Sequence, residues 1–282
     1  MEQSLKRVHL KNFSSGDSMN QIMHWIYVLI TAIIPGFLAT WLGIGGCFLR
    51  IPMIMYFFKV SIKAAYCINQ AVIALATIPG VIVHYRNRYV YGKGLIVAAI
   101  TSCLGVILGA YVVAKYLPRL VLRAIFGFAC TGIGIYVLRK TMKMKERLKT
   151  ITSLKDVGEL EHGAKLALLM FIAGFATGIC GFGGGIYFVP IFMGLAYPTH
   201  VAIGTSSAQM IFTGGMGSAV LTYHGYMNLS LFLSIGIPTL IASWLGAKAA
   251  RRSPPYLLRI VYALSIIAVG LYVAIDALMK VL

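Results

Sequence analysis

The chain of 282 residues has few acidic side chains: seven Asp and Glu stand against 25 Lys and Arg, a formal charge of +18. Charged residues of both signs make up only 11 % of the chain, and 59 % of it is hydrophobic. An average soluble protein is about 25 % charged, so these residues are too few to cover an apolar core with a polar shell. We therefore exclude a water-soluble globule and expect an integral membrane protein.

Motifs of common enzyme classes are also missing. The chain contains no HExxH, GxSxG or Walker sequence and no pair of Asp residues within an apolar run. Its five cysteines show no CxxC spacing, so we expect neither a disulfide framework nor a zinc site. We therefore expect no enzyme, no catalytic residue, no metal and no cofactor. Nucleic acid is not an expected partner, because binding it requires a solvated basic face and a chain this apolar has little solvated surface.

Long apolar runs dominate the rest of the sequence. A helix needs about 20 apolar residues to cross a hydrocarbon core about 30 Å thick. Two further apolar pieces, at about 47–58 and 184–196, are too short to cross, and each follows a glycine cluster. We expect an all-α integral membrane protein with these two short re-entrant or broken helices and about eight spans, at roughly 24–44, 64–84, 94–115, 119–139, 164–182, 201–223, 228–248 and 256–279.

The two halves of the chain match each other, which indicates an internal duplication. The aligned positions include Gly43 with Gly181, Gly45 with Gly183, Gly46 with Gly184, Pro52 with Pro190, Leu122-Arg123 with Leu258-Arg259, and Tyr136 with Tyr272. Short segments interrupted by Gly or Pro at matching positions of two halves indicate the central site of a transporter. We expect an N-terminal cytoplasmic or interfacial tail (1–23), a first repeat (24–140), a basic cytoplasmic linker (141–163) and a second repeat (164–282).

Basic residues also indicate the orientation of the chain. Lys and Arg accumulate in cytoplasmic loops, which places the linker in the cytoplasm under both topologies that we consider. If the short pieces only dip into the membrane, each half crosses four times and the repeats are parallel. If they count as crossings, each half has five and the repeats are inverted. The charge count does not choose between the two. We expect a multi-pass protein of the cell (inner) membrane.

The glycine clusters are the strongest candidate for a functional site. Helices that restart after Gly45 and Gly46, and after Gly183, Gly184 and Gly185, would present free N–H groups and the positive ends of their dipoles. Two such helix ends from related halves would form an anion-binding site that contains no formally charged side chain. Alternatively, the glycines serve only the close packing of helices, which is common in membranes.

Polar side chains near these clusters are further candidates. Arg50 lies about one turn into the first short helix and could bind an oxyanion through its guanidinium; alternatively, it reaches the lipid head groups from a shallow segment. Hydroxyl and amide groups at the start of the following spans could donate to the ligand or, alternatively, to neighbouring helices. These residues are Asn69, Thr205, Ser206, Ser207 and Gln209.

These motifs resemble the TauE/SafE sulfite-exporter family, also called the 4-toluene sulfonate uptake permeases. The resemblance rests on Gly36-Phe37 followed by Gly43-x-Gly45-Gly46, on its copy from Gly174 to Gly185, and on the run from Ala202 to Ser206. It covers residues from about 24 to 279. The first half departs from the usual pattern at Tyr66-Cys67-Ile68, where Gly-Thr-Ser is typical. The resemblance implies a substrate such as sulfite, thiosulfate or an organosulfonate.

We expect a secondary transporter that moves a small anion by alternating access around a midplane site. Of the acidic residues only Asp276 lies in a span, whereas a cation carrier usually needs a buried carboxylate. Export of an anion is downhill by about 2.3 kcal/mol per charge per 100 mV, so export could proceed uncoupled, whereas uptake would need a co-transported proton or sodium. We therefore expect export, and proton coupling is the candidate if the transport is coupled. The alternatives are an anion channel and a non-transporting membrane subunit that docks a soluble partner. Membrane lipid and a second copy in a homodimer are further candidate partners.

Overall fold

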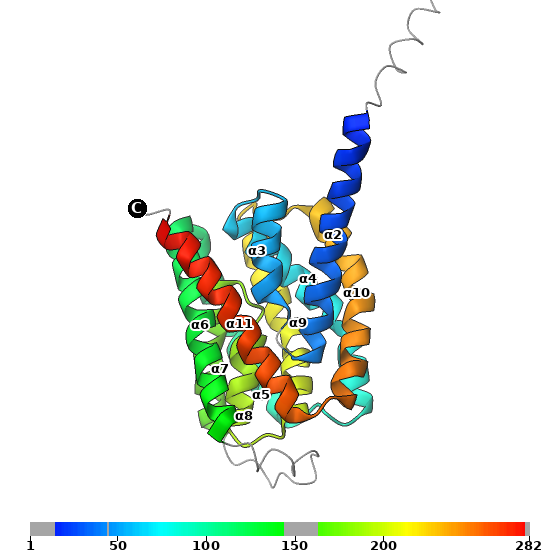
Figure 1. Ribbon diagram of the computed structural model, residues 1–282. Helices are drawn as coiled ribbons and strands as arrows, with labels where there is room; N and C mark the ends of the chain where they lie inside the picture. The colour runs from blue at the N-terminus through cyan, green and yellow to red at the C-terminus, as the bar shows by residue number, and fades with distance from the viewer. Residues whose placement is uncertain (1–14, 44, 144–162, 280–282) are drawn as a thin grey trace, which may run out of the picture.

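The computed structural model describes residues 15–43, 45–143 and 163–279, and all regular structure in these ranges is helical. Figure 1 shows the helices as a bundle. The first half contributes α2 (Ser15–Trp41), α3 (Cys47–Phe57), α4 (Ile62–Arg86), α5 (Gly92–Lys115) and α6 (Arg119–Lys143); the second contributes α7 (Gly163–Cys180), α8 (Gly185–Gly194), α9 (Thr199–Tyr223), α10 (Leu229–Arg252) and α11 (Pro255–Met279). The all-α membrane architecture is confirmed.

Seven of the described helices are long and apolar enough to cross a membrane, and α3 and α8 are the two short apolar helices. The exception among the long helices is α9, which covers the span expected at about 201–223. It has 25 residues, but its first turns carry the polar run from Gly204 to Gln209. These side chains are buried against other helices rather than exposed to lipid, which is how polar groups are accommodated at membrane depth.

Two helices extend beyond the apolar runs that mark them. α2 begins at Ser15, before the span expected from about residue 24, and α6 continues to Lys143. A helix satisfies its own backbone hydrogen bonds, so it does not have to end where its side chains become polar. Residues 1–14 of the expected tail and 144–162 of the expected linker lie outside the described residues.

Matching helices of the two halves pack against each other in opposite directions. On α6 and α11, Gly127 lies against Ala274 and Gly134 lies against Ile266. Residue numbers therefore increase along α6 where they decrease along α11, and the two helices are antiparallel. On α4 and α9, the Cys67 thiol lies 3.4 Å from the Thr222 hydroxyl, and Gly214 packs against the Gln70 carbonyl. The helices of the two halves therefore have the inverted arrangement, not the parallel one.

The glycines of the outer helices serve close packing. A Cβ on Gly105 of α5 would overlap the backbone of Phe171 on α7, and one on Gly246 of α10 would overlap the carbonyl oxygen of Phe37 on α2. The α5–α7 and α2–α10 contacts occupy matching positions in the two halves. Such close approach of helices at glycine is common in membrane proteins.

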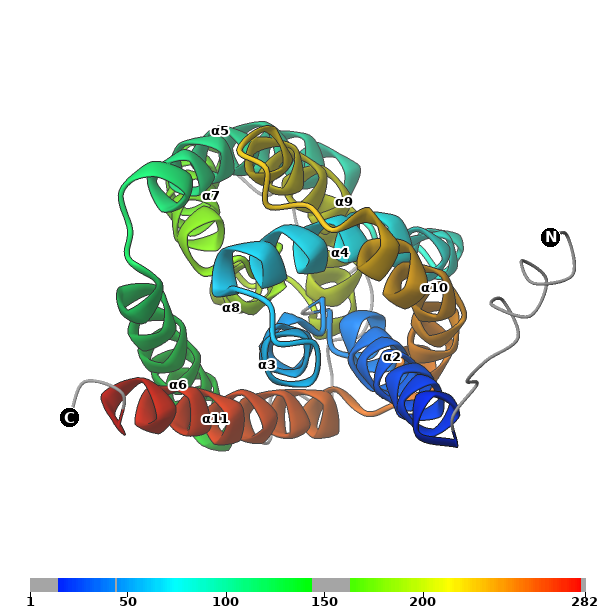
Figure 2. The same ribbon diagram turned by 90° about the horizontal axis from the view of Figure 1, so that it is seen from above.

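The short helices lie inside the bundle and point to opposite ends of it. Figure 2 shows α3, α4, α8 and α9 in the middle, with the other six labelled helices around them. We call the end of the bundle where α2 begins and α11 ends the terminal end, and the end where α6 ends and α7 begins the insert end. In Figure 1, α3 lies toward the terminal end and α8 lies toward the insert end. The chain reverses between α2 and α3 and again between α7 and α8, so the two reversals lie within the protein.

The inverted arrangement places the α4–α5 and α9–α10 connections at opposite ends of the bundle. We expect an impermeant thiol reagent to label Arg86→Cys from the cytoplasmic face and Ser230→Cys from the opposite face, since both positions are exposed. The measurement is labelling in right-side-out and inverted vesicles, with the parent protein as background. Labelling of both variants from one face would indicate parallel repeats instead.

Candidate functional site

Two glycine turns mark the places where the chain reverses. We define the first glycine turn as Gly43, Gly45 and Gly46, with φ of +73°, +76° and +65°, and the second as Gly181, Gly183 and Gly184, with φ of +69°, +66° and +110°. Residues with a Cβ rarely adopt this left-handed backbone. The matched pattern explains why glycine stands at equivalent positions of both halves.

The central helices bind the glycine turns through side-chain hydrogen bonds. Ser206 Oγ on α9 donates to the Gly43 carbonyl at 3.0 Å, and Asn69 Nδ2 on α4 donates to the Gly181 carbonyl at 2.8 Å. Each of these bonds joins a helix of one half to the turn of the other half. Thr213 Oγ1 on α9 also donates to the Gly183 carbonyl, at 2.6 Å.

Both turns approach the same side chain on α4. A Cβ on Gly45 would lie 3.0 Å from Ile73 Cδ1, and a Cβ on Gly183 would lie 2.7 Å from the same atom. Met210 on α9 closes the other side, since its sulfur would be 3.0 Å from the Gly45 Cβ. The two glycine turns therefore meet in the interior of the bundle, beside α4 and α9.

The Arg50 side chain lies at this meeting point and is 0 % exposed. Its Nη1 donates to the Gly45 carbonyl at 3.2 Å and to Asn69 Oδ1 at 3.3 Å. Its Nε and Nη2 have no hydrogen-bond partner among the described residues. The guanidinium therefore faces the protein interior. It does not reach the lipid head groups, which was the alternative role considered for Arg50.

No carboxylate in the described part of the chain is paired with Arg50. The ion pair found among the described residues joins Arg123 Nη1 to Asp276 Oδ2 at 3.2 Å and does not involve Arg50. Taking an ion out of water costs several kcal/mol when no opposite charge compensates it, and unmade hydrogen bonds add to that cost. The two Arg50 nitrogens without a partner among the described residues make this guanidinium a candidate anion-binding group.

The short helices begin at these turns without side-chain caps. The residues before α3 and α8 are Gly46 and Gly184, and neither start has a side-chain hydrogen bond to its first turn. The first N–H groups of a helix lack partners within the helix, and its dipole is positive at that end. Gly185 is the first residue of α8. Both helix starts thus add positive potential near Arg50.

Two candidate residues bind α5 and its N-terminal connection instead of the turns. Thr205 Oγ1 accepts from the Tyr91 backbone N–H at 3.0 Å. Gln209 Nε2 donates to the Ala98 carbonyl at 3.2 Å and to Ser102 Oγ at 2.8 Å. For these two residues the structure shows the alternative role, hydrogen bonding to neighbouring helices, and their side chains are not placed at the turns.

The remaining candidates have mixed placements. Ser207 Oγ is buried without a partner among the described residues, and Gly46 packs against the carbonyl of Pro35. Two residues were not among the candidates drawn from the sequence: Thr213, which binds the second turn, and Gln70, whose amide atoms are both buried without a partner among the described residues. Gln70 adjoins Asn69 in the same polar run, so its place in the sequence could have identified it as a candidate.

Comparison with known proteins identifies the family. The family model "Sulfite exporter TauE/SafE" matches residues 28–273. The chain belongs to the TauE/SafE sulfite-exporter family. It is therefore a multi-pass membrane protein of a family of probable membrane transporters, and the resemblance drawn from the glycine motifs is confirmed.

Individual relatives of this TauE/SafE protein are also described as transporters. A probable membrane transporter protein of Methanocaldococcus jannaschii is 26 % identical over 87 % of this chain and 93 % of its own. One from Bacillus subtilis is 25 % identical over 80 % of this chain and 87 % of its own. An Arabidopsis thaliana protein named "Sulfite exporter TauE/SafE family protein 3" is 34 % identical over 29 % of this chain and 17 % of its own. No solved structure matches the chain significantly.

The unpaired charge of Arg50 predicts an unusual stability change. We expect Arg50→Met to raise the unfolding temperature in anion-free buffer by a few degrees, because a buried charge is replaced by an apolar side chain, a gain on the order of 1 kcal/mol or more. The measurement is thermal unfolding of the purified protein. Arg123→Met is the control and should lower the temperature, since it leaves Asp276 without Arg123. An unchanged or lower temperature for Arg50→Met would contradict the expectation.

Proposed function

We propose that this TauE/SafE protein is a secondary transporter that exports a small sulfur-containing anion, such as sulfite, thiosulfate or an organosulfonate. The observation that carries the proposal is the fully buried Arg50 guanidinium beside the two glycine turns, two of whose nitrogens have no partner among the described residues. An oxyanion would accept charge-assisted hydrogen bonds from Nε and Nη2 in the planar geometry that guanidinium groups favour.

The chemistry of the site supports an oxyanion of this size. One full positive charge and two helix starts, each equivalent to roughly half a charge, match an anion of charge one or two. The nearby Asn69 and Ser206 are neutral, and their side chains already bind the turns. The name of the family and that of the Arabidopsis relative support sulfite as the first compound to test.

The inverted arrangement supports alternating access. α3 leads from the first glycine turn toward the terminal end, and α8 leads from the second turn toward the insert end (Figure 1). Because Asn69 and Ser206 each join a turn to the opposite half, a movement between the halves changes the contacts around Arg50. Binding and movement would then be coupled at the same residues, as in other transporters with inverted repeats.

The electrostatics favour export over uptake. Moving an anion out of a cell with a negative interior releases about 2.3 kcal/mol per charge per 100 mV, so export needs no coupling ion. Uptake would need one, with a proton as the candidate. Among the described residues with a placed side chain, Asp276 is the single carboxylate, and it is paired with Arg123.

The test is sulfite flux through purified protein in liposomes. We expect saturable flux from the parent and at least about a tenfold loss with Arg50→Gln, because hydrogen bonds to a charged group contribute about 1.5–3 kcal/mol. Gly183→Ala should also lower the flux, since its Cβ would crowd Ile73 at a positive φ. Gly215→Ala is the matched control, because nothing lies within 4 Å of its added Cβ.

Other outcomes would contradict the proposal. Flux that does not saturate, together with single-channel currents, would indicate an anion channel. A protein that neither binds nor moves any sulfur oxyanion, and that loses its cellular role when residues 142–160 are deleted, would be a membrane subunit that docks a soluble partner. Full flux in Arg50→Gln would exclude the site described above.

A further inference from the structure

Two cavities at opposite ends of the bundle have matching surroundings. The first, which we call the terminal mouth, lies between α2, the end of α3 and the start of α10, and it has a volume of about 380 Å³. The second, the insert mouth, lies between the start of α7, the end of α8 and the start of α5, and it has a volume of about 120 Å³. Each mouth is therefore bounded by one short central helix and two outer helices.

The residues that line the two mouths stand at equivalent positions of the repeats. The alignment that joins Gly46 to Gly184 also joins lining residues at the ends of α3 and α8. The first turns of α5 and α10 line one mouth each, and they align as Gly109 does with Gly246 in the same helices. The aligned lining pairs include Phe57 with Leu195, Lys59 with Tyr197, and Lys93 with Ser230.

Each mouth has a lysine in its lining, but the two lysines are not equivalent. Lys59 follows the end of α3 in the terminal mouth, and Tyr197 stands at its position in the other half. Lys93 lies in the first turn of α5 in the insert mouth, and its counterpart in α10 is Ser230. The two mouths therefore share a positive charge rather than a conserved position for it.

This charge is specific to the two ends of the bundle. Neither mouth has an Asp or Glu among the described residues that line it, and the ion pair found in the described part of the chain, Arg123 with Asp276, involves neither lysine. Two cavities of similar size on the sides of the bundle, at Ile172 and at Ile96, have no charged residue in their described linings. Cavity size alone therefore does not bring lysine with it.

Both lysines stand where the local backbone favours another residue. Lys59 has a φ of +52°, a left-handed conformation that glycine adopts more readily. Lys93 is the second residue of α5, where the positive end of the helix dipole opposes a cation. An anion held in each mouth would offset the unfavourable charge of Lys93 and would give the strained position of Lys59 a function.

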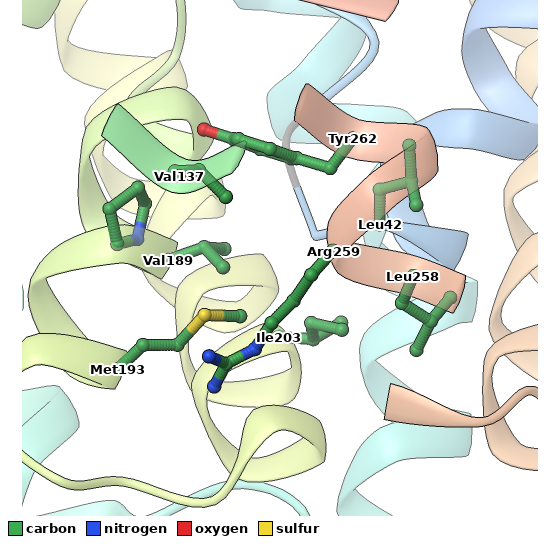
Figure 3. A pocket seen from close by; sticks show the side chains of 9 residues that line it. Leu42, Val137, Val189, Met193, Ile203, Leu258, Arg259 and Tyr262 are labelled. Carbon is green, nitrogen blue, oxygen red and sulfur yellow. The ribbon is translucent and has the colours of Figure 1, made fainter. Parts of the chain in front are cut away.

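The two mouths differ in how open they are. Tyr197 narrows the insert mouth, since its ring lies 5.7 Å from that of Tyr91 and its hydroxyl would be 2.7 Å from a Cβ on Gly94. Between α8 and the first glycine turn, the cavity that Figure 3 shows beside Arg259 and Met193 has a volume of about 10 Å³. That is space for about one water molecule and not for an oxyanion. The terminal mouth is therefore the more open one in this structure.

We propose that the terminal mouth and the insert mouth are anion-binding entrances to the transport path, in which Lys59 on one face of the membrane and Lys93 on the other hold the sulfur oxyanion. This inference rests on the proposed function, because it adds two outer sites to the path through Arg50. α3 runs from the first glycine turn to the terminal mouth, and α8 runs from the second turn to the insert mouth. Each short helix thus joins an entrance to the central site.

Thiol labelling of the purified full-length protein tests the charge of each mouth without transport. Ser234→Cys places a thiol in the terminal mouth and Val97→Cys places one in the insert mouth. At low ionic strength, we expect a negatively charged methanethiosulfonate reagent to react faster than a positively charged one at both positions. Adding Lys59→Gly to the first variant and Lys93→Gln to the second should lower this rate ratio by about fivefold.

The lysine variants are chosen to keep the fold. Glycine suits the positive φ of Lys59, and removing a cation from the first turn of α5 does not weaken that helix. Lys115→Gln at the terminal end and Lys143→Gln at the insert end are the matched controls, because both lysines are exposed and line neither mouth. They should leave the rate ratios unchanged.

Sulfite flux into oriented vesicles tests the role of the mouths in transport. In right-side-out vesicles at low ionic strength, we expect Lys59→Gly to raise the sulfite concentration for half-maximal initial flux by about threefold, with the maximal flux retained. Lys93→Gln should have this effect in inverted vesicles instead, where the insert end, expected in the cytoplasm, faces the medium. At an ionic strength of about 1 M, where the Debye length is about 3 Å, both differences should disappear.

The outcomes separate the mouths from the proposed function. Rate ratios that do not change in Lys59→Gly and Lys93→Gln, or that change equally in the control variants, would overturn the mouths and leave the Arg50 site standing. Changed ratios with unaltered half-saturation from both faces would also overturn them, because the cavities would then take no part in transport. A parent without sulfite flux would overturn the proposed function and, with it, the mouths as parts of that path.

Discussion

A positive charge buried without a carboxylate is the constraint on which the rest of the site depends. Arg50 is held by the Gly45 carbonyl and by the Asn69 amide oxygen, and both interactions use the same nitrogen. The other two nitrogens are buried and have no hydrogen-bond partner in the part of the chain that the structure describes. Only groups with negative potential, or an anion, compensate such a charge at low dielectric, and this is the physical basis of the proposed anion site.

The central helices make this arrangement tolerable in a membrane. α4 and α9 carry amides and hydroxyls that would be costly against lipid, yet most of these side chains are buried among the surrounding helices. Asn69 and Ser206 donate hydrogen bonds to carbonyls of the glycine turns. Close packing at outer glycines such as Gly105 and Gly246 allows the outer helices to enclose this polar interior.

Much of the fold was predictable from the sequence, because apolar length and glycine spacing are local properties. The ten helices of the described ranges, the two short ones among them, and the positions of the glycine turns follow from these patterns. The direction of the repeats was not predictable, since the distribution of Lys and Arg fits both topologies. Residues near a turn in sequence also differ in where they point: Ser206 reaches Gly43, whereas Thr205 beside it faces Tyr91. That difference depends on helix rotation within the bundle, which composition does not specify.

The central claim is that an anion completes the Arg50 site, and a structure determined with bound selenite tests it most directly. Selenite has the shape and charge of sulfite, and its selenium is located by anomalous scattering. The account predicts a selenium peak within hydrogen-bonding reach of Arg50 Nε and Nη2, between the two glycine turns, that disappears in Arg50→Met. A structure with selenium bound elsewhere and none beside Arg50 would contradict it.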